Sequence, residues 1–414
     1  MNRVEMETEL EDIVRSISFP RYSGTDGWKK AREILLSHFK RLGFNHSEES
    51  FTASDFFMRR VNTLPYFITG IYVAILTIVN VFFVIPVASI LMGAFLVVIA
   101  FTIEKIIQAI KYPVIHSKFG IKHEATNILI ENPVRKKTEN PRHVLYFIAH
   151  TDSKSETPSP HVLFTIIYLS IFFGSIIVGI HSVTRGLVLL LDAGAKETSP
   201  FHPHLSYGFV IAFVDALRVI TRYGPGKSPG ANDDGTGIAI LMMLEKEMER
   251  QTLALVDFKC VLVGAEELGE VGTHHFILAR EEQGVMLNPR RDHFVIIDGI
   301  AGNNMYYFTR EGWRMRPFSA FLVPLFDNFL QEQDGLGDIS FKSMWMPPPV
   351  NTDHSAVIFH GQDAFVIASS ENVSHTPEDT PDNVNFTAVA ALARALQDFI
   401  MYIDTSLEKP DHRA

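Results

Sequence analysis

Hydrophobic residues form unusually long uncharged runs in the first half of the chain. No charged side chain interrupts residues 61–103, a run of 43 positions. This run is too long for one membrane-spanning helix and long enough for two of about 20 residues each. Asn80 and Pro86 mark the turn expected between them. A soluble core hairpin rarely sustains such length, so we predict a transmembrane hairpin within residues 61–111.

Two later apolar stretches predict a second transmembrane insertion within residues 161–222. Residues 162–180 are uncharged and long enough to cross ~30 Å of hydrocarbon as a helix. Residues 205–220 are apolar but contain Asp215 and Arg218, which favours a position near a span end or against protein. An even number of crossings returns the chain to the same side, so we predict four spans in total, with residues 187–191 as an interfacial segment.

The remaining segments, 1–60, 112–160 and 223–414, predict one discontinuous α/β domain. Residues 28–42 have helical spacing and Gly43 follows them, as at a helix end. Alternating strands and helices indicate an α/β fold, a three-layer α/β/α sandwich with a mixed, largely parallel sheet. Strands are predicted at 126–130, 144–149, 258–265, 293–297 and 365–368, and further helices at the N-terminus, 238–250 and 384–403.

Composition narrows the functional classes. The hydrophobic content of 47%, with 32 Phe, agrees with part of the chain lying in lipid, whereas a net charge of −10 argues against nucleic acid as a partner. The single Cys260 excludes an internal disulfide and a cysteine-rich zinc module. Any metal site must therefore use His and carboxylate ligands. The acidic, polar N-terminus lacks the pattern of a cleavable signal peptide.

The charges around the first hairpin predict its orientation. Basic residues flank it on the side of the α/β segments, and its turn carries none. By the positive-inside rule the α/β domain faces the cytoplasm, although Arg185 and Lys196 near the second turn weaken that inference. The flanking residues are Arg59, Arg60, Lys105 and Lys111.

Polar candidates follow the predicted strands, where parallel α/β sheets bind their ligands. His150 and Asp152, at i and i+2, would share a face, so that the Asp fixes the imidazole tautomer while the His binds metal. Glu266 and Glu267 are adjacent, so one carboxylate can bind a metal while the other moves protons. Further candidates are Asp233 and Asp234 in the Gly-rich loop Pro229–Gly237, Asp298 after a strand, and His375 before a Pro-containing turn.

Each of these signals has an ordinary explanation when taken alone. An Asp pair beside glycine is most often a solvated turn or a helix cap, and adjacent glutamates often mark a helix start. Five separate loops, however, supply two His and several carboxylates without sulfur. This set suits a hydrolytic zinc pair better than a structural zinc.

Order and sequence together resemble the co-catalytic zinc aminopeptidases of family M28, relatives of glutamate carboxypeptidase and glutaminyl cyclase. The family pattern of H-x-D, P-G-A-x-D-[DN]-x-[AS]-G, E-E, D and H-T-x-x-D matches residues 150–152, 229–237, 266–267, 298 and 375–379. The early GTDGWKKAREIL also resembles the first helix of the family. Thr236 replaces the usual Ala or Ser, and both apolar insertions depart from the soluble relatives.

The resemblance implies roles for individual residues. His150 and Asp298 would bind one zinc, Glu267 and His375 the other, and Asp233 would bridge the two ions. Glu266 would be the general base, and a cis peptide would join Asp233 to Asp234. Asp353 and His354, in a further family signature, would contact substrate or support the site, with solvent exposure as the alternative. Asp234 and Asp379 would belong to the same supporting set.

The sequence thus predicts a membrane-anchored di-zinc exopeptidase that hydrolyses N-terminal residues from short peptides. One alternative is another amide chemistry on the same fold, such as carboxypeptidase or glutaminyl cyclase action. Another is a membrane transport or peptide-binding protein with a non-catalytic domain, which the intact Glu266 disfavours. A weak third alternative, intramembrane proteolysis, would use Asp192 and Asp215.

Overall fold

The computed structural model describes most of the chain outside the second apolar insertion. The described residues are 1–61, 64–83, 85–116, 118–139, 141–157, 173–191, 208, 210, 222–224, 226–312, 315–333, 336–346, 350–371 and 373–408. Nearly all of the predicted span at 205–220, the first part of that at 162–180, and both Asp192 and Asp215 lie outside the described residues.

The chain divides into two compact units, each built from discontinuous segments. The first, here called the α/β unit, comprises Met1–Ala53, Lys122–Ser155 and Gly224–Ala414. The second, the helical unit, comprises Ser54–Ile121 and Glu156–Tyr223. Two short strands, β4 (Ser155–Thr157) and β5 (Arg222–Gly224), pair with each other where the chain passes between these segments.

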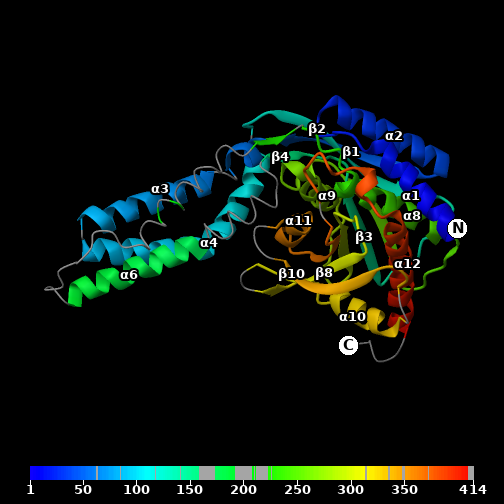
Figure 1. Ribbon diagram of the computed structural model, residues 1–414. Coiled ribbons are helices and arrows are strands. Elements are labelled where there is room, and N and C mark those ends of the chain that lie inside the picture. The colour runs from blue at the N-terminus through cyan, green and yellow to red at the C-terminus, as the bar shows by residue number, and fades with distance from the viewer. Residues whose placement is uncertain are drawn as a thin grey trace. The chain divides into compact units, whose positions relative to one another are not determined.

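A nine-stranded mixed sheet forms the centre of the α/β unit (Figure 1). The neighbouring strands β6, β3, β7 and β11 run parallel, whereas β2 pairs antiparallel with β6 and β8 pairs antiparallel with β11. The sheet is therefore mixed and largely parallel at its centre, as predicted. In spatial order the strands are β1 (Asn45–Ser54), β2 (Lys122–Glu131), β6 (Val256–Val263), β3 (His143–His150), β7 (Asp292–Ile297), β11 (Asp363–Ser369), β8 (Asn304–Glu311) and β10 (Ser340–Met346), with β9 (Arg316–Pro317) paired to β8.

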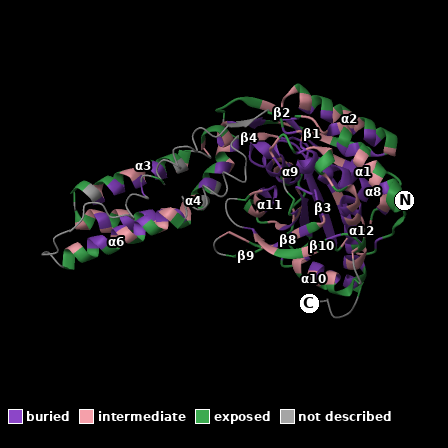
Figure 2. Cartoon of the chain, viewed as in Figure 1, coloured by how far each residue is buried: buried purple, intermediate pink, exposed green. Residues whose placement is uncertain are grey.

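Helices cover both faces of this sheet and make the three layers. Alternate residues of β3 serve the two cores: Leu145 and Phe147 pack into one, Val144 and Tyr146 into the other. Every residue of β3 is buried, which explains its continuous apolar sequence (Figure 2). One face carries α1 (Arg3–Ile17), α2 (Asp26–Leu42), α8 (Thr236–Glu247), α10 (Leu322–Glu332) and α12 (Phe386–Glu408), and the other carries α9 (Val271–Glu282) and α11 (His354–Phe359).

The predicted elements of the α/β unit are present with small shifts at their ends. Helix α2 begins at Asp26 because Thr25 accepts the Trp28 amide as an N-cap. It ends at Gly43, whose φ of 77° is the left-handed conformation that glycine favours at this position. Strands β1, β8 and β10 and helices α9 to α11 were not predicted from the sequence. Burial along these three strands is irregular, unlike the continuous burial of β3.

Within its described residues, the helical unit contains three apolar helices: α3 (Leu64–Ile78), α4 (Pro86–Ile115) and α6 (Ser175–Leu191). The predicted turn is confirmed, because a π-helical segment, Val79–Phe83, ends the first helix and Pro86 opens the next. Residues 187–191 belong to α6 itself rather than to a separate interfacial segment, because its helical pattern continues to Leu191.

Helices α4 and α6 pack closely through glycine. A Cβ on Gly93 would lie 2.6 Å from the carbonyl oxygen of Gly179, and one on Gly186 would lie 2.6 Å from that of Pro86. Close approach at small residues is typical of helices that associate within lipid. Polar contacts join α6 to the π-helical segment Val79–Phe83, since Asn80 donates to Ser182 at 3.2 Å and Arg185 donates to the Asn80 carbonyl.

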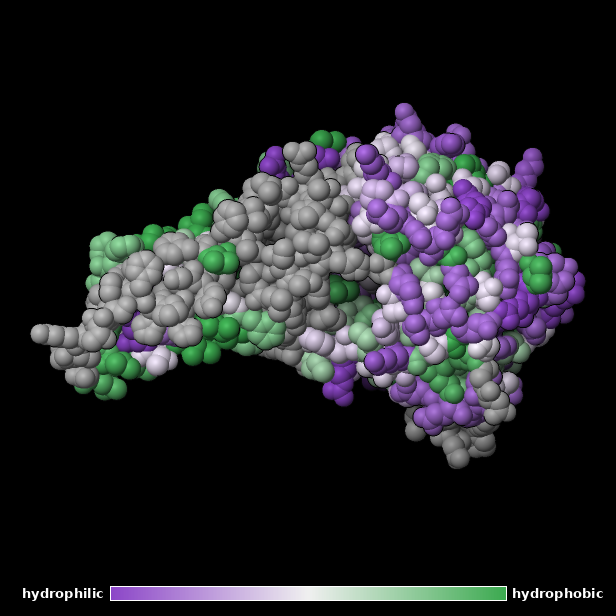
Figure 3. Space-filling view, in the orientation of Figure 1, coloured by the Kyte–Doolittle hydropathy of each residue, from purple (hydrophilic) through white to green (hydrophobic). Residues whose placement is uncertain are grey.

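The outer surface of the helical unit is strongly apolar, and Figure 3 shows mostly hydrophobic side chains where this unit is coloured. Phe82 is 70% exposed and Leu91 66% exposed. Among the described residues two helices are long and apolar enough to cross a membrane: the Pro86–Ile103 part of α4, and α12. Helix α12 packs in the core of the α/β unit, which leaves α4 as the helix whose apolar surface lacks a covering core.

We predict that Asp404 on α12 anchors the start of β6. Its carboxylate accepts the backbone N–H groups of Ala254, Leu255 and Val256 at 2.7–2.9 Å. Asp404→Ala would remove the acceptor of three backbone donors, of which that of Val256 is buried, at a cost of about 3 kcal/mol. That cost corresponds to a Tm lower by about 6–12 °C in a unit of this size.

Thermal unfolding followed by circular dichroism would measure this shift. Asp398→Ala, on an exposed position of the same helix, is the matched control and should change Tm little. Equal Tm values for the two variants would show that the Asp404 contacts contribute nothing to stability.

Candidate metal centre

The centre lies at the carboxyl ends of the parallel strands, where the loops after several strands converge. His150 ends β3, Asp298 follows β7 directly, and Glu267 lies four residues beyond the end of β6. His375 comes from the loop after β11, and Asp233 from the loop that opens α8. Two groups of three side chains share Asp233: His150 with Asp298, and Glu267 with His375. The ligand atoms within each group all lie within 4.8 Å of one another.

Asp233 presents one oxygen to each histidine. Its Oδ1 lies 2.9 Å from His150 Nε2, and its Oδ2 lies 3.1 Å from His375 Nε2. On either side of it, His150 Nε2 is 3.9 Å from Asp298 Oδ1 and His375 Nε2 is 3.3 Å from Glu267 Oε1. The geometry is that of a carboxylate shared between two adjacent binding positions.

The loop that carries Asp233 depends on its glycines. Gly230 has φ of 69°, and a Cβ there would lie 2.7 Å from the Asp233 carbonyl oxygen. The Asp233–Asp234 peptide is cis, as the resemblance implies. Asp234 is fully buried and accepts the backbone N–H groups of His150 (3.0 Å) and Gly237 (3.1 Å). It therefore caps α8 and ties that helix to β3, and its carboxylate has a supporting role.

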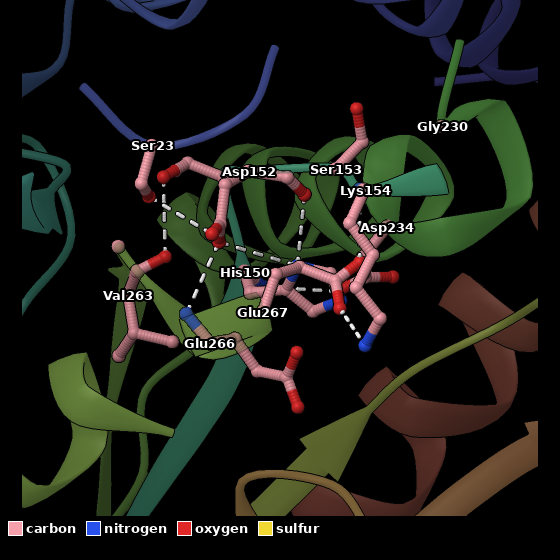
Figure 4. Close-up of polar contacts among 12 residues, drawn as sticks. Ser23, His150, Asp152, Ser153, Lys154, Gly230, Asp234, Val263, Glu266 and Glu267 are labelled. Carbon is pink, nitrogen blue, oxygen red and sulfur yellow. Dashed lines mark hydrogen bonds and ion pairs between the residues drawn. The ribbon is translucent and has the colours of Figure 1, made fainter. Parts of the chain in front are cut away.

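Asp152 supports His150 differently from the expected arrangement. The ring Nδ1 of His150 lies 3.0 Å from the backbone carbonyl oxygen of Asp152 and 3.7 Å from its carboxylate. The Nδ1–H therefore donates to the backbone, which orients the ring so that Nε2 faces Asp233 in the centre. The carboxylate instead accepts the Ser23 hydroxyl at 2.8 Å and the Glu266 amide at 3.1 Å (Figure 4).

The backbone adopts uncommon conformations around the glutamate pair and His375. Ala265, Glu270 and His375 have φ of 58°, 53° and 64°, and they are three of the four non-glycine residues with positive φ in the described chain. Such conformations cost about 1–3 kcal/mol each and concentrate at functional sites. They turn Glu266 and Glu267 sharply away from β6, and Figure 4 shows the Glu266 carboxylate apart from the carboxylate of Glu267.

Burial and mutual repulsion raise the pKa of several carboxyl groups here. Burial, together with nearby Asp233, raises the pKa of Asp298 to about 7. Burial also raises the pKa of Glu266 well above its usual value, against the opposing effect of His150. Glu267 is the exception: burial acts to raise its pKa, but Lys154 and His375 outweigh it and lower the value to about 2.

The pKa values of the two histidines are also raised, but by attraction to carboxylates and against the effect of burial. Burial alone would lower the pKa of His150, but hydrogen bonds to Asp152 and Asp233 raise it well above the usual value. For His375, burial and Lys154 act to lower the pKa, whereas Glu267 and Asp233 raise it well above the usual value. Both shifts have the same cause, which is a buried excess of negative charge that attracts cations.

The donor set fits divalent metal ions. Two imidazole nitrogens and three carboxylates surround two adjacent positions, and none of these ligands is sulfur, which matches the preferences of catalytic zinc. Divalent ions would also compensate the buried carboxylates that otherwise raise one another's pKa. The residues present therefore fit a metal pair.

Asp353 and His354 are buried, at 1% and 2% exposure, which excludes the solvent-exposed alternative. The Asp353 carboxylate accepts the Thr273 hydroxyl at 2.6 Å, and its charge acts on both Glu266 and Asp298. His354 Nε2 lies 3.4 Å from Glu311. Asp353 thus borders the centre without belonging to either group of three, whereas the polar contacts of His354 are with Glu311 and Thr352.

Asp379 supports the Asp233 loop through hydrogen bonds to its backbone. Its carboxylate accepts the Asn232 N–H at 2.6 Å, and its carbonyl accepts the Ala231 N–H at 3.2 Å. Burial, with Asp233 nearby, raises the pKa of Asp379 to about 7. The carboxylate therefore binds backbone rather than capping the segment that follows it.

The structure adds Arg21, which no sequence pattern singled out. Its guanidinium is fully buried and donates to the backbone carbonyls of Thr151 (2.9 Å), Pro229 (2.5 Å) and Gly230 (2.7 Å). These carbonyls belong to the two loops that carry His150 and Asp233. An arginine in a polar loop usually faces solvent, so only the folded chain reveals this role.

A third group of potential ligands, Glu9, Asp12 and His38, lies on α1 and α2. Arg41 already pairs with Glu9 and Asp12, and its guanidinium lies 2.7 Å from His38 Nδ1. A cationic side chain therefore occupies this group, and we assign no metal to it.

Comparisons with known proteins agree with this geometry. Residues 204–400 match the model of Peptidase family M28, a range that contains Asp233, Glu267, Asp298 and His375. No curated protein matches the sequence.

Solved structures share the fold at low sequence identity. Glutaminyl cyclase from Macrostomum lignano is 13% identical with a TM-score of 0.52, covering 99% of this chain and 93% of its own. An aminopeptidase from Aneurinibacillus sp. strain AM-1 and a zinc aminopeptidase from Bacillus subtilis are each 12% identical with TM-scores of 0.51, covering 97% of this chain and 94% of theirs. At these identities the likeness shows the fold.

We predict that Arg21 maintains the metal centre by joining its two loops. Arg21→Met would leave three carbonyls without their donor and loosen both loops, so metal affinity should fall by about 10- to 100-fold. Arg21→Lys keeps the charge but not the fork of donors, and its affinity should be intermediate.

Isothermal titration of chelator-treated protein with Zn²⁺ would measure these affinities. Arg15→Met, which removes only surface pairs with Glu11 and Asp382, serves as control. Wild-type affinity in Arg21→Met would refute a positioning role for this arginine.

Proposed function

We propose that this chain, which carries a peptidase family M28 domain, is a di-zinc exopeptidase that removes N-terminal residues from short peptides. The observation that carries the proposal is the position of Asp233, with one oxygen 2.9 Å from His150 and the other 3.1 Å from His375. A carboxylate so placed can bridge two metal ions, as two-metal hydrolysis requires.

Each metal position has its own ligands. His150 and Asp298 would hold one zinc, Glu267 and His375 the second, and Asp233 both. Zinc held there would lower the pKa of a nucleophilic water and polarise the scissile carbonyl. The ligands come from separate loops, so the distances between them are set by the fold and not by their spacing along the sequence.

Glu266 is the proposed general base. It precedes the proposed ligand Glu267. Its backbone N–H donates a hydrogen bond of 3.1 Å to the Asp152 carboxylate, which holds the backbone of Glu266 in place. Its carboxylate would accept a proton from the attacking water and return it to the leaving amine. To accept and then return a proton, the Glu266 carboxylate must not be bound to a metal ion. Glu267, by contrast, is a proposed metal ligand.

A second amide chemistry on the same site is glutaminyl cyclisation. The specific observation in its favour is that glutaminyl cyclases are among the structural neighbours, with TM-scores as high as those of the aminopeptidases. Peptides with a free N-terminal glutamine would give a pyroglutamyl product with a cyclase and free glutamine with an aminopeptidase. A carboxypeptidase would instead act on N-terminally blocked peptides.

We predict that Glu266→Gln abolishes turnover while retaining the metal. Loss of the general base should lower kcat by about 10²- to 10⁴-fold. Hydrolysis of amino-acid anilides and elemental analysis of the same preparations would test both parts, with about two zinc ions per chain expected. Glu282→Gln, at an exposed position of α9, is the control. Full activity in Glu266→Gln, or protein that binds no zinc, would reject the proposed mechanism.

The helical unit is proposed as a multi-pass membrane anchor. Its support is the apolar exposed surface of α3, α4 and α6, the close glycine packing of α4 on α6, and the length of the Pro86–Ile103 segment. The proposed orientation, with the peptidase domain in the cytoplasm, rests on the basic residues that flank the first hairpin. Protease protection in sealed vesicles would test that orientation.

We predict that the protein stays with membranes after alkaline carbonate extraction. Replacing Leu91 and Phe95, which are 66% and 54% exposed on α4, by Lys should weaken insertion by about 2.5–3.5 kcal/mol each. The double variant should therefore move substantially into the extractable fraction. Val134→Lys, at a 69% exposed position of the α/β unit, should not. Wild-type protein in the carbonate supernatant would exclude an integral anchor.

A further inference from the structure

Lys154 reaches into the metal centre, and the mechanism above gives it no part. It follows the His150–Asp152 segment, and its side chain turns toward Glu267 (Figure 4). Its Nζ lies 2.5 Å from Glu267 Oε2, and its backbone N–H donates to Glu267 Oε1 at 3.2 Å. One residue thus contacts both oxygens of a proposed ligand. The Lys154 side chain is only 10% exposed and that of Glu267 1% exposed.

We propose that Lys154 is a positioning residue that makes the two metal positions unequal. It holds Glu267 as a ligand with one available oxygen, so the position formed by Asp233, Glu267 and His375 binds its divalent ion more weakly. The position formed by His150, Asp233 and Asp298 binds tightly. This inference rests on the proposed metal centre and adds to it the order in which metal ions occupy the two positions.

The two oxygens of Glu267 face different partners. Oε1 lies 3.3 Å from His375 Nε2, the imidazole nitrogen that also lies 3.1 Å from the shared Asp233. Oε2 lies against the Lys154 ammonium. A metal that took both oxygens would have to displace a buried ion pair, so the carboxylate offers Oε1 alone. Loss of a second ligand oxygen reduces the number of bonds at this position.

Charge acts in the same direction. The Lys154 ammonium is a fixed positive neighbour of Glu267, and its charge also acts on His375, so both ligands private to this position face a competing cation. The groups that act most strongly on Asp298 are Asp233, His150, Asp353 and Glu267, with no lysine or arginine among them. A divalent ion is therefore repelled more at one position than at the other.

A purely structural ion pair would leave metal binding unchanged, so variants of this one side chain separate the two roles. Lys154→Met keeps the length and removes the charge, and Lys154→Arg keeps the charge. Lys227→Met, at an exposed position after the second insertion, is the matched control. The experiment is titration of the full-length, chelator-treated protein in detergent with Zn²⁺ by calorimetry, and with Co²⁺ by its visible absorption.

The wild type, Lys227→Met and Lys154→Arg should bind metal in two steps, with a second Kd at least 10-fold weaker than the first. Lys154→Met should tighten the second Kd by about 10- to 100-fold, on the scale of changes beyond the direct ligands, and leave the first unchanged. Two equal sites in the wild type, or an unchanged second Kd in Lys154→Met, would overturn the proposal while the metal centre stands. The wild-type titration decides the point even if Lys154→Met fails to fold. A wild type that binds no divalent ion would overturn the metal centre as well.

Discussion

The interaction on which the centre depends is the attraction between a buried excess of carboxylates and the cations around them. Asp233, Glu266, Glu267 and Asp298 meet at one edge of the sheet, where burial raises the pKa of Asp298 to about 7. Water cannot solvate these groups, so the protein must neutralise them, protonate them or bind metal. Two histidines and Lys154 provide part of the compensation, and divalent ions would provide the rest.

The scaffold around the centre serves to keep these charges in place. Arg21 joins the His150 and Asp233 loops through their carbonyls, and Asp234 ties the start of α8 to the β3 backbone. Both residues bind backbone groups of the two loops and not the side chains of the ligands. The ligand atoms of His150 and Asp233 therefore remain directed toward the centre. Loss of a supporting contact of this kind commonly lowers metal affinity by about 10- to 100-fold.

Much of the α/β unit could be predicted because its central strands are buried on both faces. Because both faces of β3 are buried, the residues from Val144 to Ala149 are all apolar, and this continuous run allowed the strand to be predicted. Outer elements such as β8 and β10 alternate burial weakly, since one face is partly solvated, and the sequence alone did not reveal them. The cis Asp233–Asp234 bond followed from resemblance and not from any local propensity.

The candidate site residues were predictable for a related reason. His150, the Glu266–Glu267 pair and Asp298 come at or just after the end of a strong strand, and Asp233 lies in a Gly-rich loop, so residue type and position agree. His375 lacks such a position, since it lies six residues beyond the end of β11, and the Pro-containing turn after it, together with the resemblance, singled it out. The supporting residues carry no such signal: Lys154 and Arg21 look like ordinary surface cations until folding buries them. Asp152 illustrates the same limit. The spacing of His150 and Asp152 predicted that the two residues contact each other, but not that the backbone carbonyl of Asp152 would accept the hydrogen bond from the imidazole.

The discontinuity of the α/β unit has a consequence for biosynthesis. The insertion at 156–223 separates His150 from Asp233, and His375 comes 225 residues after His150. At synthesis rates of 5–20 residues per second, roughly 10–45 s pass between these two histidines leaving the ribosome's catalytic centre. For the first part of that time, until β6 and β7 have been synthesised, β3 lacks its parallel neighbours and its apolar faces are not fully covered. Nascent chains of this protein should therefore be unable to retain metal, and should depend on chaperones, until translation is almost complete.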